Sequence, residues 1–434
     1  MFSVQRKDFG EDFVFGVATA AYQIEGGQTD GRESCIWDSY AATPGNTKNG
    51  ESGVEACDHY ARWKTDLDLI RAGGFDAYRF SFAWPRLIPE GTGRVNPEGV
   101  AFYDRLLDGM LERGIRPFAT LYHWDLPSAL QDRGGWMNRD IASWFADYAT
   151  LVAQKFGDRL ASIATLNEPW CTAYLGHFIG RHAPGCRDIR ATARAMHHVL
   201  FAHGTAIDAL RAESAKNLGI VTVMKDFQAA SSSPEDARAT SIEDALFNRW
   251  YLDGPLRGEY PSELVALLEP HLPRNWQADL PVVSRPLDWL GINYYTRQIC
   301  QYDESVPLWR SRRVVGDREK NDLGWEIYPE GLTHVLIRAA REYTKLPIYV
   351  TENGITENDD TRRVEFYAKH LLALRAAREA GVDVRGYFAW SLLDNYEWAE
   401  GYTPRFGLVH TDYATQTRTP KGSFRAFQKL LTAS

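Results

Sequence analysis

The sequence predicts an α/β protein whose residues 1–434 form one domain with the (β/α)8, or TIM, barrel fold. Two observations lead to this prediction. Short β-rich runs alternate with amphipathic stretches along the whole chain, which indicates parallel strands joined by helical crossovers. There are eight such runs, and no Pro-rich or Gly/Ser-rich linker divides them. A chain of 434 residues also lies within the range that one barrel with insertions can reach.

Each predicted strand is a short run rich in β-branched, aromatic or other apolar residues. In chain order the eight strands are expected at residues 13–22, 77–82, 116–122, 161–166, 218–223, 287–294, 347–351 and 384–390. Helices are expected between them, at residues 60–72, 99–113, 141–156, 192–213, 331–343, 361–380 and, at the end, 419–431. The structural alternative is an open, doubly wound sheet, for which a Gly-rich dinucleotide fingerprint would be expected after one strand. Gly91-Thr92-Gly93 lacks the third glycine, so we prefer the closed barrel.

Composition excludes several classes of function. The formal net charge is −8 and no Lys/Arg block is present, so we expect no nucleic-acid partner. The N-terminus lacks the apolar core of a signal peptide, and no 18-residue apolar run occurs, so we expect a cytoplasmic protein with no membrane partner. The five cysteines are scattered without a C-x-x-C pair, and three histidines at 197, 198 and 203 lack the i, i+4 spacing. We therefore expect no disulfide framework, no metal site and no cofactor.

A barrel assembles its active site from the C-terminal ends of its strands, and two of these ends carry a glutamate. The fourth strand ends in Thr165-Leu166-Asn167-Glu168-Pro169, and the seventh ends in Thr351-Glu352-Asn353-Gly354. Two carboxylates are the minimum that glycoside hydrolysis requires, one to protonate the leaving oxygen and one to attack the sugar or activate water.

The surroundings of the two glutamates predict different roles. Arg79, at the end of the second strand, is the cation best placed to keep Glu352 ionised, and Tyr295 is expected to donate a hydrogen bond to the same carboxylate. The period of two along the sixth strand puts Tyr295 on the same face as Asn293, which is why we choose it over Tyr294. Glu168 lies beside Trp170, and we expect this apolar setting to raise its pKa toward the role of an acid.

With these motifs in view, the sequence resembles glycoside hydrolase family 1. The resemblance extends from residue 15 to residue 408 and includes Asn167-Glu168-Pro169, Thr351-Glu352-Asn353-Gly354 and Tyr122-His123-Trp124-Asp125. It implies a retaining β-glucosidase of carbohydrate metabolism and cellulose degradation, which forms a covalent intermediate on Glu352 and uses Glu168 as acid/base. Its partner would be a small β-glycoside, and the oligomeric state stays open.

The resemblance also implies a set of sugar-binding residues. Asn167 would bond the 2-hydroxyl, Trp390 would form the floor under the sugar, and Glu397 would accept from the 4- and 6-hydroxyls. Phe406 would wall the region near the 6-hydroxyl, and Trp325 is a candidate for the outer rim, together with Trp170, Leu175 and His182. The remaining expected contacts are Gln23, His123, Trp124, Asn293, Tyr295 and Trp398.

Other functions remain open. Glu397 and Gln23 can satisfy either epimer of a 4-hydroxyl, so a β-galactosidase or β-fucosidase is an alternative, as is a transglycosylase with the same site. A silent sugar-binding protein would be expected to lack one of the glutamates, and both are present. A phosphate on the 6-hydroxyl would face the Glu397 carboxylate, so unphosphorylated sugars are expected. The Arg-rich segment 304–319 matches no pattern we can interpret.

Overall fold

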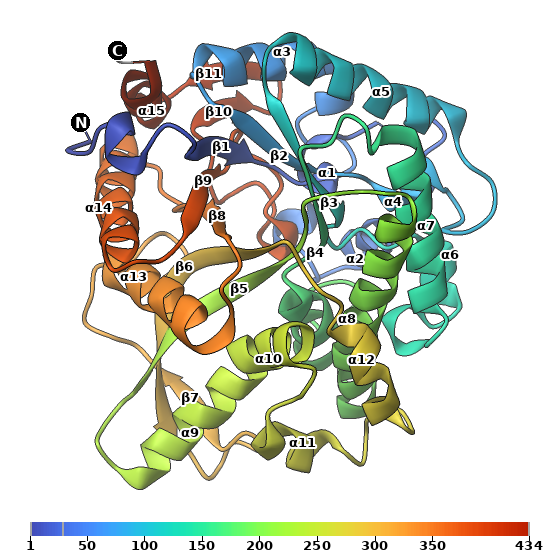
Figure 1. Ribbon diagram of the computed structural model, residues 1–434, viewed down its shortest axis with the longest axis vertical. Coiled ribbons are helices and arrows are strands. Elements are labelled where there is room, and N and C mark those ends of the chain that lie inside the picture. Colours follow the sequence, from blue (N-terminus) through green and yellow to red (C-terminus); the bar gives the residue numbers. More distant parts are fainter. Residues whose placement is uncertain (1, 28–29, 433–434) are drawn as a thin grey trace.

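Eight parallel strands close into a barrel at the centre of the molecule (Figure 1). The computed structural model describes residues 2–27 and 30–432. Each strand pairs with its neighbour in the order β5-β4-β3-β2-β1-β9-β8-β6, and pairing of β6 with β5 completes the ring. The fold is therefore the predicted (β/α)8 barrel. Its strands are β1 (Val14–Ala18), β2 (Ala77–Ser81), β3 (Arg116–Tyr122), β4 (Ser162–Asn167), β5 (Leu218–Ala229), β6 (Trp289–Tyr302), β8 (Ile348–Asn353) and β9 (Val384–Trp390).

Side chains fill the inside of the barrel, as expected for a barrel of this size. The rings of Phe118 and Phe388 meet in this core with their centroids 5.0 Å apart, although β3 and β9 are not adjacent. Gly16 on β1 makes room for this packing, because a Cβ atom there would lie 2.4 Å from the Phe388 ring. The core below the active site thus depends on the absence of a side chain at residue 16.

An outer layer of helices covers the barrel (Figure 1). Several begin with a side chain that accepts a backbone N–H of the first turn, such as Asn96, Asp188 and Asp359. The long helices are α3 (His59–Ala72), α5 (Pro97–Glu112), α7 (Ile141–Phe156), α8 (Ile189–Ala212), α13 (Pro329–Arg338), α14 (Asp360–Glu379) and α15 (Gly422–Thr432). Short helices α1 (Ala21–Ile24), α2 (Ile36–Ala42), α4 (Trp84–Leu87) and α6 (Ser128–Asp132) lie in the connections.

The structure corrects the predictions at several places. β5 and β6 continue to Ala229 and Tyr302, past their predicted ends at residues 223 and 294. Residues 19–22 are not strand, since β1 ends at Ala18 and Tyr22 lies in α1. Residue 419 is not helical either: it belongs to the hairpin of β10 (Val409–Asp412) and β11 (Thr417–Pro420), and α15 starts only at Gly422. The Arg-rich segment contains an unpredicted strand, β7 (Ser311–Val314), antiparallel to β6. Between β5 and β6 lie further unpredicted helices: α9 (Pro234–Asp244), η5 (Ala245–Arg249), α10 (Trp250–Arg257), α11 (Ser262–Leu268), η6 (Trp276–Asp279) and α12 (Leu280–Val283).

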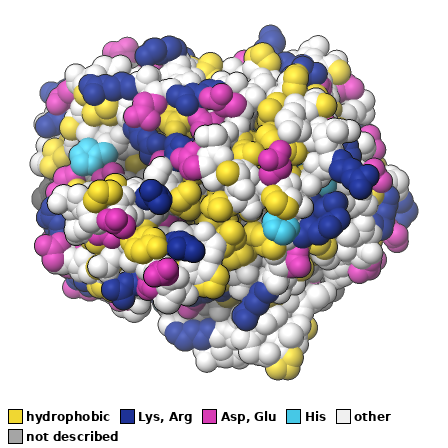
Figure 2. All heavy atoms as spheres, turned by 90° about the horizontal axis from the view of Figure 1, so that it is seen from below, with side chains coloured by type: hydrophobic (Ala, Val, Ile, Leu, Met, Phe, Trp, Pro, Cys, Tyr) yellow, Lys and Arg dark blue, Asp and Glu magenta, His cyan; other side chains and the backbone are white. Residues whose placement is uncertain are grey.

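The surface is mixed in charge. On the face shown in Figure 2, basic and acidic side chains are interspersed, and hydrophobic side chains gather near the middle. None of the helices in the described part of the chain combines the length and the apolarity that crossing a bilayer would need.

Candidate active site

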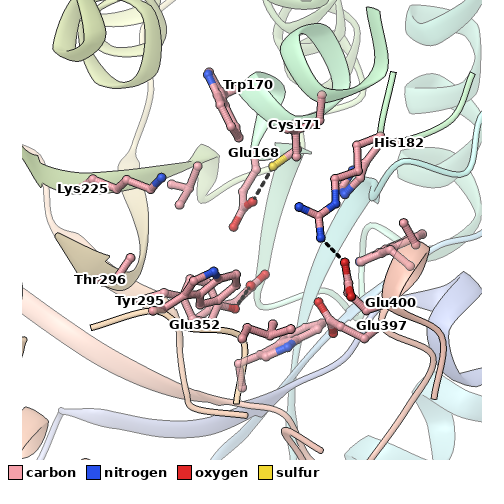
Figure 3. A pocket seen from close by; sticks show the side chains of 18 of the residues that line it. Glu168, Trp170, Cys171, His182, Lys225, Tyr295, Thr296, Glu352, Glu397 and Glu400 are labelled. Atoms are coloured by element: carbon pink, nitrogen blue, oxygen red, sulfur yellow. Dashed lines mark hydrogen bonds and ion pairs between the residues drawn. The ribbon is translucent and has the colours of Figure 1, made fainter. Parts of the chain in front are cut away.

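A cavity of about 370 Å³ is lined by residues from the C-terminal ends of the barrel strands and the loops that follow them. Glu168 directly follows β4, and Glu352 is the penultimate residue of β8. Both contribute to the wall of the cavity (Figure 3). Gly354, two residues after Glu352, passes so close to β9 that a Cβ atom would lie 1.9 Å from the Trp390 carbonyl oxygen. The exits of β8 and β9 are thereby held together beside the cavity.

Glu352 is a buried carboxylate with a donor on each oxygen. The Arg79 guanidinium binds Oε1 at 2.5 Å, and the Tyr295 hydroxyl donates to Oε2 at 2.6 Å. Burial raises the pKa of Tyr295 well above its usual value, and the charge of Glu352 adds to this shift, so the phenol remains a hydrogen-bond donor.

Glu168 has a different environment. Burial, and then the negative charge of Glu352, raise the pKa of Glu168 to about 7. Oε1 accepts a hydrogen bond from Asn293 Nδ2 at 2.6 Å, and Oε2 accepts one from the Cys171 thiol at 3.0 Å. A carboxyl group with a pKa near neutrality can both donate and accept a proton near pH 7.

Polar side chains connect the two glutamates. Asn293 donates to Glu168 and also stands opposite Glu352 in the register of β6 and β8. Asn167 Oδ1 accepts from Arg79 Nη2 at 2.7 Å and from Asn293 Nδ2 at 3.0 Å. The Asn167 amide nitrogen lies 3.0 Å from His123 Nε2. Because the amide nitrogen can only donate, His123 Nε2 accepts, and the neutral imidazole ring carries its proton on Nδ1. Within the described residues, the buried His123 Nδ1 has no hydrogen-bond partner.

Aromatic rings and the carboxylates of Glu397 and Glu400 line the part of the cavity near β9. Trp390 and His123 are nearly parallel, with an interplanar angle of 16° and centroids 6.0 Å apart. Burial raises the pKa of Glu397 to about 8, with contributions from Glu352 and Glu168. The other predicted sugar contacts on this wall are Trp124, Trp325, Trp398 and Phe406.

Four predicted site residues lie outside the lining: Gln23, Arg79, Asn167 and Asn293. Each hydrogen-bonds a residue that does line the cavity. Gln23 is fully buried, and its amide nitrogen lies 3.5 Å from Glu397 Oε2. The choice of Tyr295 over Tyr294 agrees with the geometry, because the Tyr294 hydroxyl turns away to donate to the Tyr328 carbonyl.

All four candidates for the outer rim line the cavity: Trp170, Leu175, His182 and Trp325. Other lining residues were not among the predicted site residues. Among these are Cys171, Lys225, Phe247, Arg313 and Glu400. Cys171 follows the Asn-Glu-Pro-Trp motif directly and could have been found by its helical proximity to Glu168. The others come from segments whose structure the pattern did not indicate.

The three histidines considered as metal ligands have structural partners. His197 contacts Asp279 and Tyr260, His198 contacts a backbone carbonyl, and His203 contacts Thr165. In residues 2–27 and 30–432, no group of three His, Cys, Asp or Glu side chains is arranged to hold a metal ion.

Known proteins resemble this chain over nearly its full length. The family model described as glycosyl hydrolase family 1 matches residues 5–434. Beta-glucosidase A of Thermotoga maritima is 45% identical over 96% of this chain and 96% of its own, and a beta-glucosidase of Agrobacterium sp. is 45% identical over 97% and 95%. The solved structure of the family 1 b-glucosidase from Thermotoga maritima superposes with a TM-score of 0.96 at 43% identity, over 98% of this chain and 99% of that one.

Proposed function

Because the chain belongs to glycosyl hydrolase family 1 and is a β-glucosidase, we propose that it releases terminal β-D-glucosyl residues by double displacement on Glu352. Its substrates would be short β-linked glucosides, including those formed in cellulose degradation, and aryl or alkyl glucosides. The observation that carries this proposal is the unequal environment of the two glutamates: Arg79 and Tyr295 bond the two oxygens of Glu352, and the raised pKa of Glu168 keeps a proton available.

In the first step a Glu352 oxygen attacks the anomeric carbon while Glu168 gives its proton to the glycosidic oxygen. The bond to the leaving group breaks as the ester to Glu352 forms, and the aglycone departs as an alcohol. Loss of charge on Glu352 removes one of the causes that raise the pKa of Glu168, so Glu168 stays ionised after giving up its proton and is available to accept one in the second step. It then takes a proton from water, which attacks the ester and releases β-glucose.

We propose retention rather than inversion because a retaining mechanism is typical of the family to which the chain belongs. Retaining enzymes keep their carboxyl groups about 5 Å apart, whereas inverting enzymes leave about 6.5–9.5 Å for a water molecule. Here Asn293 bonds Glu168 at 2.6 Å and is the register neighbour of Glu352 on the adjacent strand. Asn293 therefore bonds one glutamate and neighbours the other in the sheet, and a measured anomeric configuration of the first product decides between the two outcomes.

The sugar would lie over Trp390, with Glu397 and Gln23 bonding its outer hydroxyls and His123 and Asn167 bonding the others. A bifunctional β-D-glucosidase/β-D-fucosidase from Bifidobacterium breve is 40% identical over 98% of this chain, so activity on β-fucosides is a second expected reaction.

We also propose that residues 1–434 act as one catalytic domain. Five free cysteines, four of them buried, support a cytoplasmic location.

The nucleophile is tested with Glu352→Ala and azide. The variant should lose hydrolysis of an aryl β-glucoside by more than a thousandfold, and azide should restore aryl release with α-glucosyl azide as the product, because the anion enters from the side that Glu352 occupied. Glu168→Ala is the matched control: with an activated leaving group, azide should give β-glucosyl azide. Near wild-type hydrolysis by Glu352→Ala, or the same anomer from both variants, would contradict the assignment.

A further inference from the structure

The cavity has a second end, which we call the aglycone end and define by Trp170, Phe247, Lys225 and Arg313. These residues follow β4, lie in η5, and belong to β5 and β7. Glu397 comes from the loop after β9, on the other side of the ring of strands. Figure 3 shows Lys225 beyond Glu168 and Trp170, and Glu397 at the opposite side. Since Glu168 protonates the leaving oxygen, a leaving group extends toward the aglycone end.

Lys225 places a positive charge between two rings at this end. Its Nζ lies 4.4 Å from the centroid of Phe247 and 5.9 Å from that of Trp170, and it donates to Gln298 Oε1 at 3.0 Å. Burial and then Arg313 lower the pKa of Lys225 to about 8, while Glu243, Cys171 and Cys300 act in the other direction. The amino group is therefore mostly charged below pH 8, at the edge of an apolar cavity.

Arg313 adds a second positive charge that no carboxylate neutralises. It is exposed, it lines the cavity, and within the described ranges it forms no ion pair. Arg181, the remaining lining arginine, is paired with Glu400. Glu243 influences Lys225 but is not a lining residue. The carboxylates that line the described cavity are Glu168, Glu352, Glu397 and Glu400, and the last two belong to the segment after β9, across the ring of strands from Lys225.

We propose that the aglycone end recognises aglycones that combine an aromatic ring with a carboxylate, so that the enzyme prefers β-glucosides of phenolic acids. The ring would pack on Trp170 and Phe247, and the carboxylate would accept from Lys225 and Arg313. This inference rests on the proposed function, and it assigns the Arg-rich segment 304–319 a role in substrate selection through Arg313. Two cations at one end of a cavity favour an anionic group over a neutral isostere.

The test compares two aryl β-glucosides whose phenols carry, para to the oxygen, either a propionate or its primary amide. Two methylene groups separate the charge from the ring, so the two leaving groups have similar reactivity. We expect kcat/KM for the acid to exceed that for the amide by about tenfold at pH 6.5, the factor that corresponds to ~1.4 kcal/mol. The glucosyl intermediate is common to both substrates, so the difference must arise before the aglycone departs.

Four variants locate the charge. Lys225→Met should reduce the acid/amide ratio to near one, and Lys225→Arg should keep most of it. Arg313→Gln should lower the ratio in part, and it tests the proposal without risk to folding because the side chain is exposed. Arg312→Gln is the matched control, since Arg312 is the preceding residue on β7, bonds Gln301 and does not line the cavity.

A ratio of one or less in the wild type, or a ratio unchanged by Lys225→Met and Arg313→Gln, would overturn the inference. If the enzyme hydrolysed neither of the two glucosides and no other aryl β-glucoside, the result would contradict the proposed function instead. Calorimetric titration with the free phenol propionate and its amide then still decides the inference. Tighter binding of the acid that Lys225→Met removes would support it, and equal binding would reject it.

Discussion

Three residues on the cavity wall have a backbone conformation that side chains other than glycine rarely adopt. Trp124, Glu168 and Trp398 have φ values of 79°, 46° and 54°. Each such residue costs of the order of 1–3 kcal/mol, which the surrounding structure must offset. Here the offset is visible: Trp124 donates to the Asn167 carbonyl at 2.9 Å, and the Trp398 and Trp124 rings pack with centroids 4.6 Å apart. The chain accepts local strain in order to aim these side chains into the site.

The Cys171 thiol is expected to tune Glu168. Its hydrogen bond favours the carboxylate and lowers the pKa of Glu168, against the larger opposite effect of burial. Glycosylation needs Glu168 protonated, so kcat/KM should fall as the pH rises through about 7. Cys171→Ala removes the donor, raises the pKa, and should move this limb to higher pH in the kcat/KM profile of a neutral aryl glucoside. Cys171→Ser retains a donor and should not. A shift to lower pH in the alanine variant would contradict this role.

At the scale of elements, the regular parts of the barrel were predictable and the insertions were not. β3, β9 and α7 begin and end where the pattern places them, because their apolar runs are bounded by clear polar breaks. β7 has the sequence Ser-Arg-Arg-Val, which shows no alternation, and it forms only because β6 extends past the barrel and offers an unpaired edge. The predicted site residues lie on the regular strands or in the recognised loops. Lys225, Phe247 and Arg313 were missed because β5 continues through the polar residues 225 and 226 and because η5 and β7 were not predicted.

The contact of β8 with β9 at Gly354 gives a prediction at this scale. In Gly354→Ala the new Cβ would meet the Trp390 carbonyl, so the two strand exits must separate. We expect a loss of about 1–3 kcal/mol in the free energy of unfolding, measured in urea, and a lower kcat because Glu352 and Trp390 move apart. Gly204→Ala is the control, since its Cβ would meet the Val282 carbonyl at 1.8 Å, away from the cavity. It should destabilise the protein but leave kcat unchanged; a loss of kcat in both variants would show that the effect is not local.

Asp279 joins three elements and gives a pH-dependent prediction. It accepts from His197 on α8 and from Arg139 before α7, and these contacts lower its pKa despite the opposing effect of burial. Its stabilising contribution is therefore complete above the unfolded pKa of about 3.9 and is lost as the pH falls toward the folded value. Asp279→Asn should cost about 2 kcal/mol at pH 7, and the difference from wild type should shrink below about pH 4. The exposed pair of Asp208 with Arg285 is the control, and Asp208→Asn should change stability little. An equal loss at pH 7 and pH 3 would exclude the carboxylate as the cause.

For the whole molecule, closure of the barrel is what creates the site. Arg79 meets Glu352, Asn167 meets Asn293, and Gln23 meets Glu397, so residues of the first half of the chain contact residues of the second half in every layer of the site. The pairing of β1 with β9 brings the two chain ends to the same side, where Figure 1 places the N-terminus beside α15. We call the region where β1 pairs with β9 and α15 packs near the N-terminus the seam of the barrel. The stability of this seam is therefore expected to govern unfolding of the whole barrel.

Phe427 on α15 tests this expectation. Its fully buried ring contacts Phe2 near the N-terminus, Phe75 before β2 and Tyr367 on α14, with centroid distances of 5.0, 5.7 and 5.0 Å. Phe427→Ala should lower the free energy of unfolding by about 3–5 kcal/mol, and Phe427→Leu by less, because the cavity left behind is smaller. None of these residues lines the active-site cavity, so kcat at 25 °C should match wild type. Since the seam closes the ring of strands, loss of activity and loss of tryptophan fluorescence should coincide along the denaturant axis for both variants. If α15 detached first, the alanine variant would show a spectroscopic transition at lower denaturant with activity retained, and the seam would then be an appendage of an independently stable barrel.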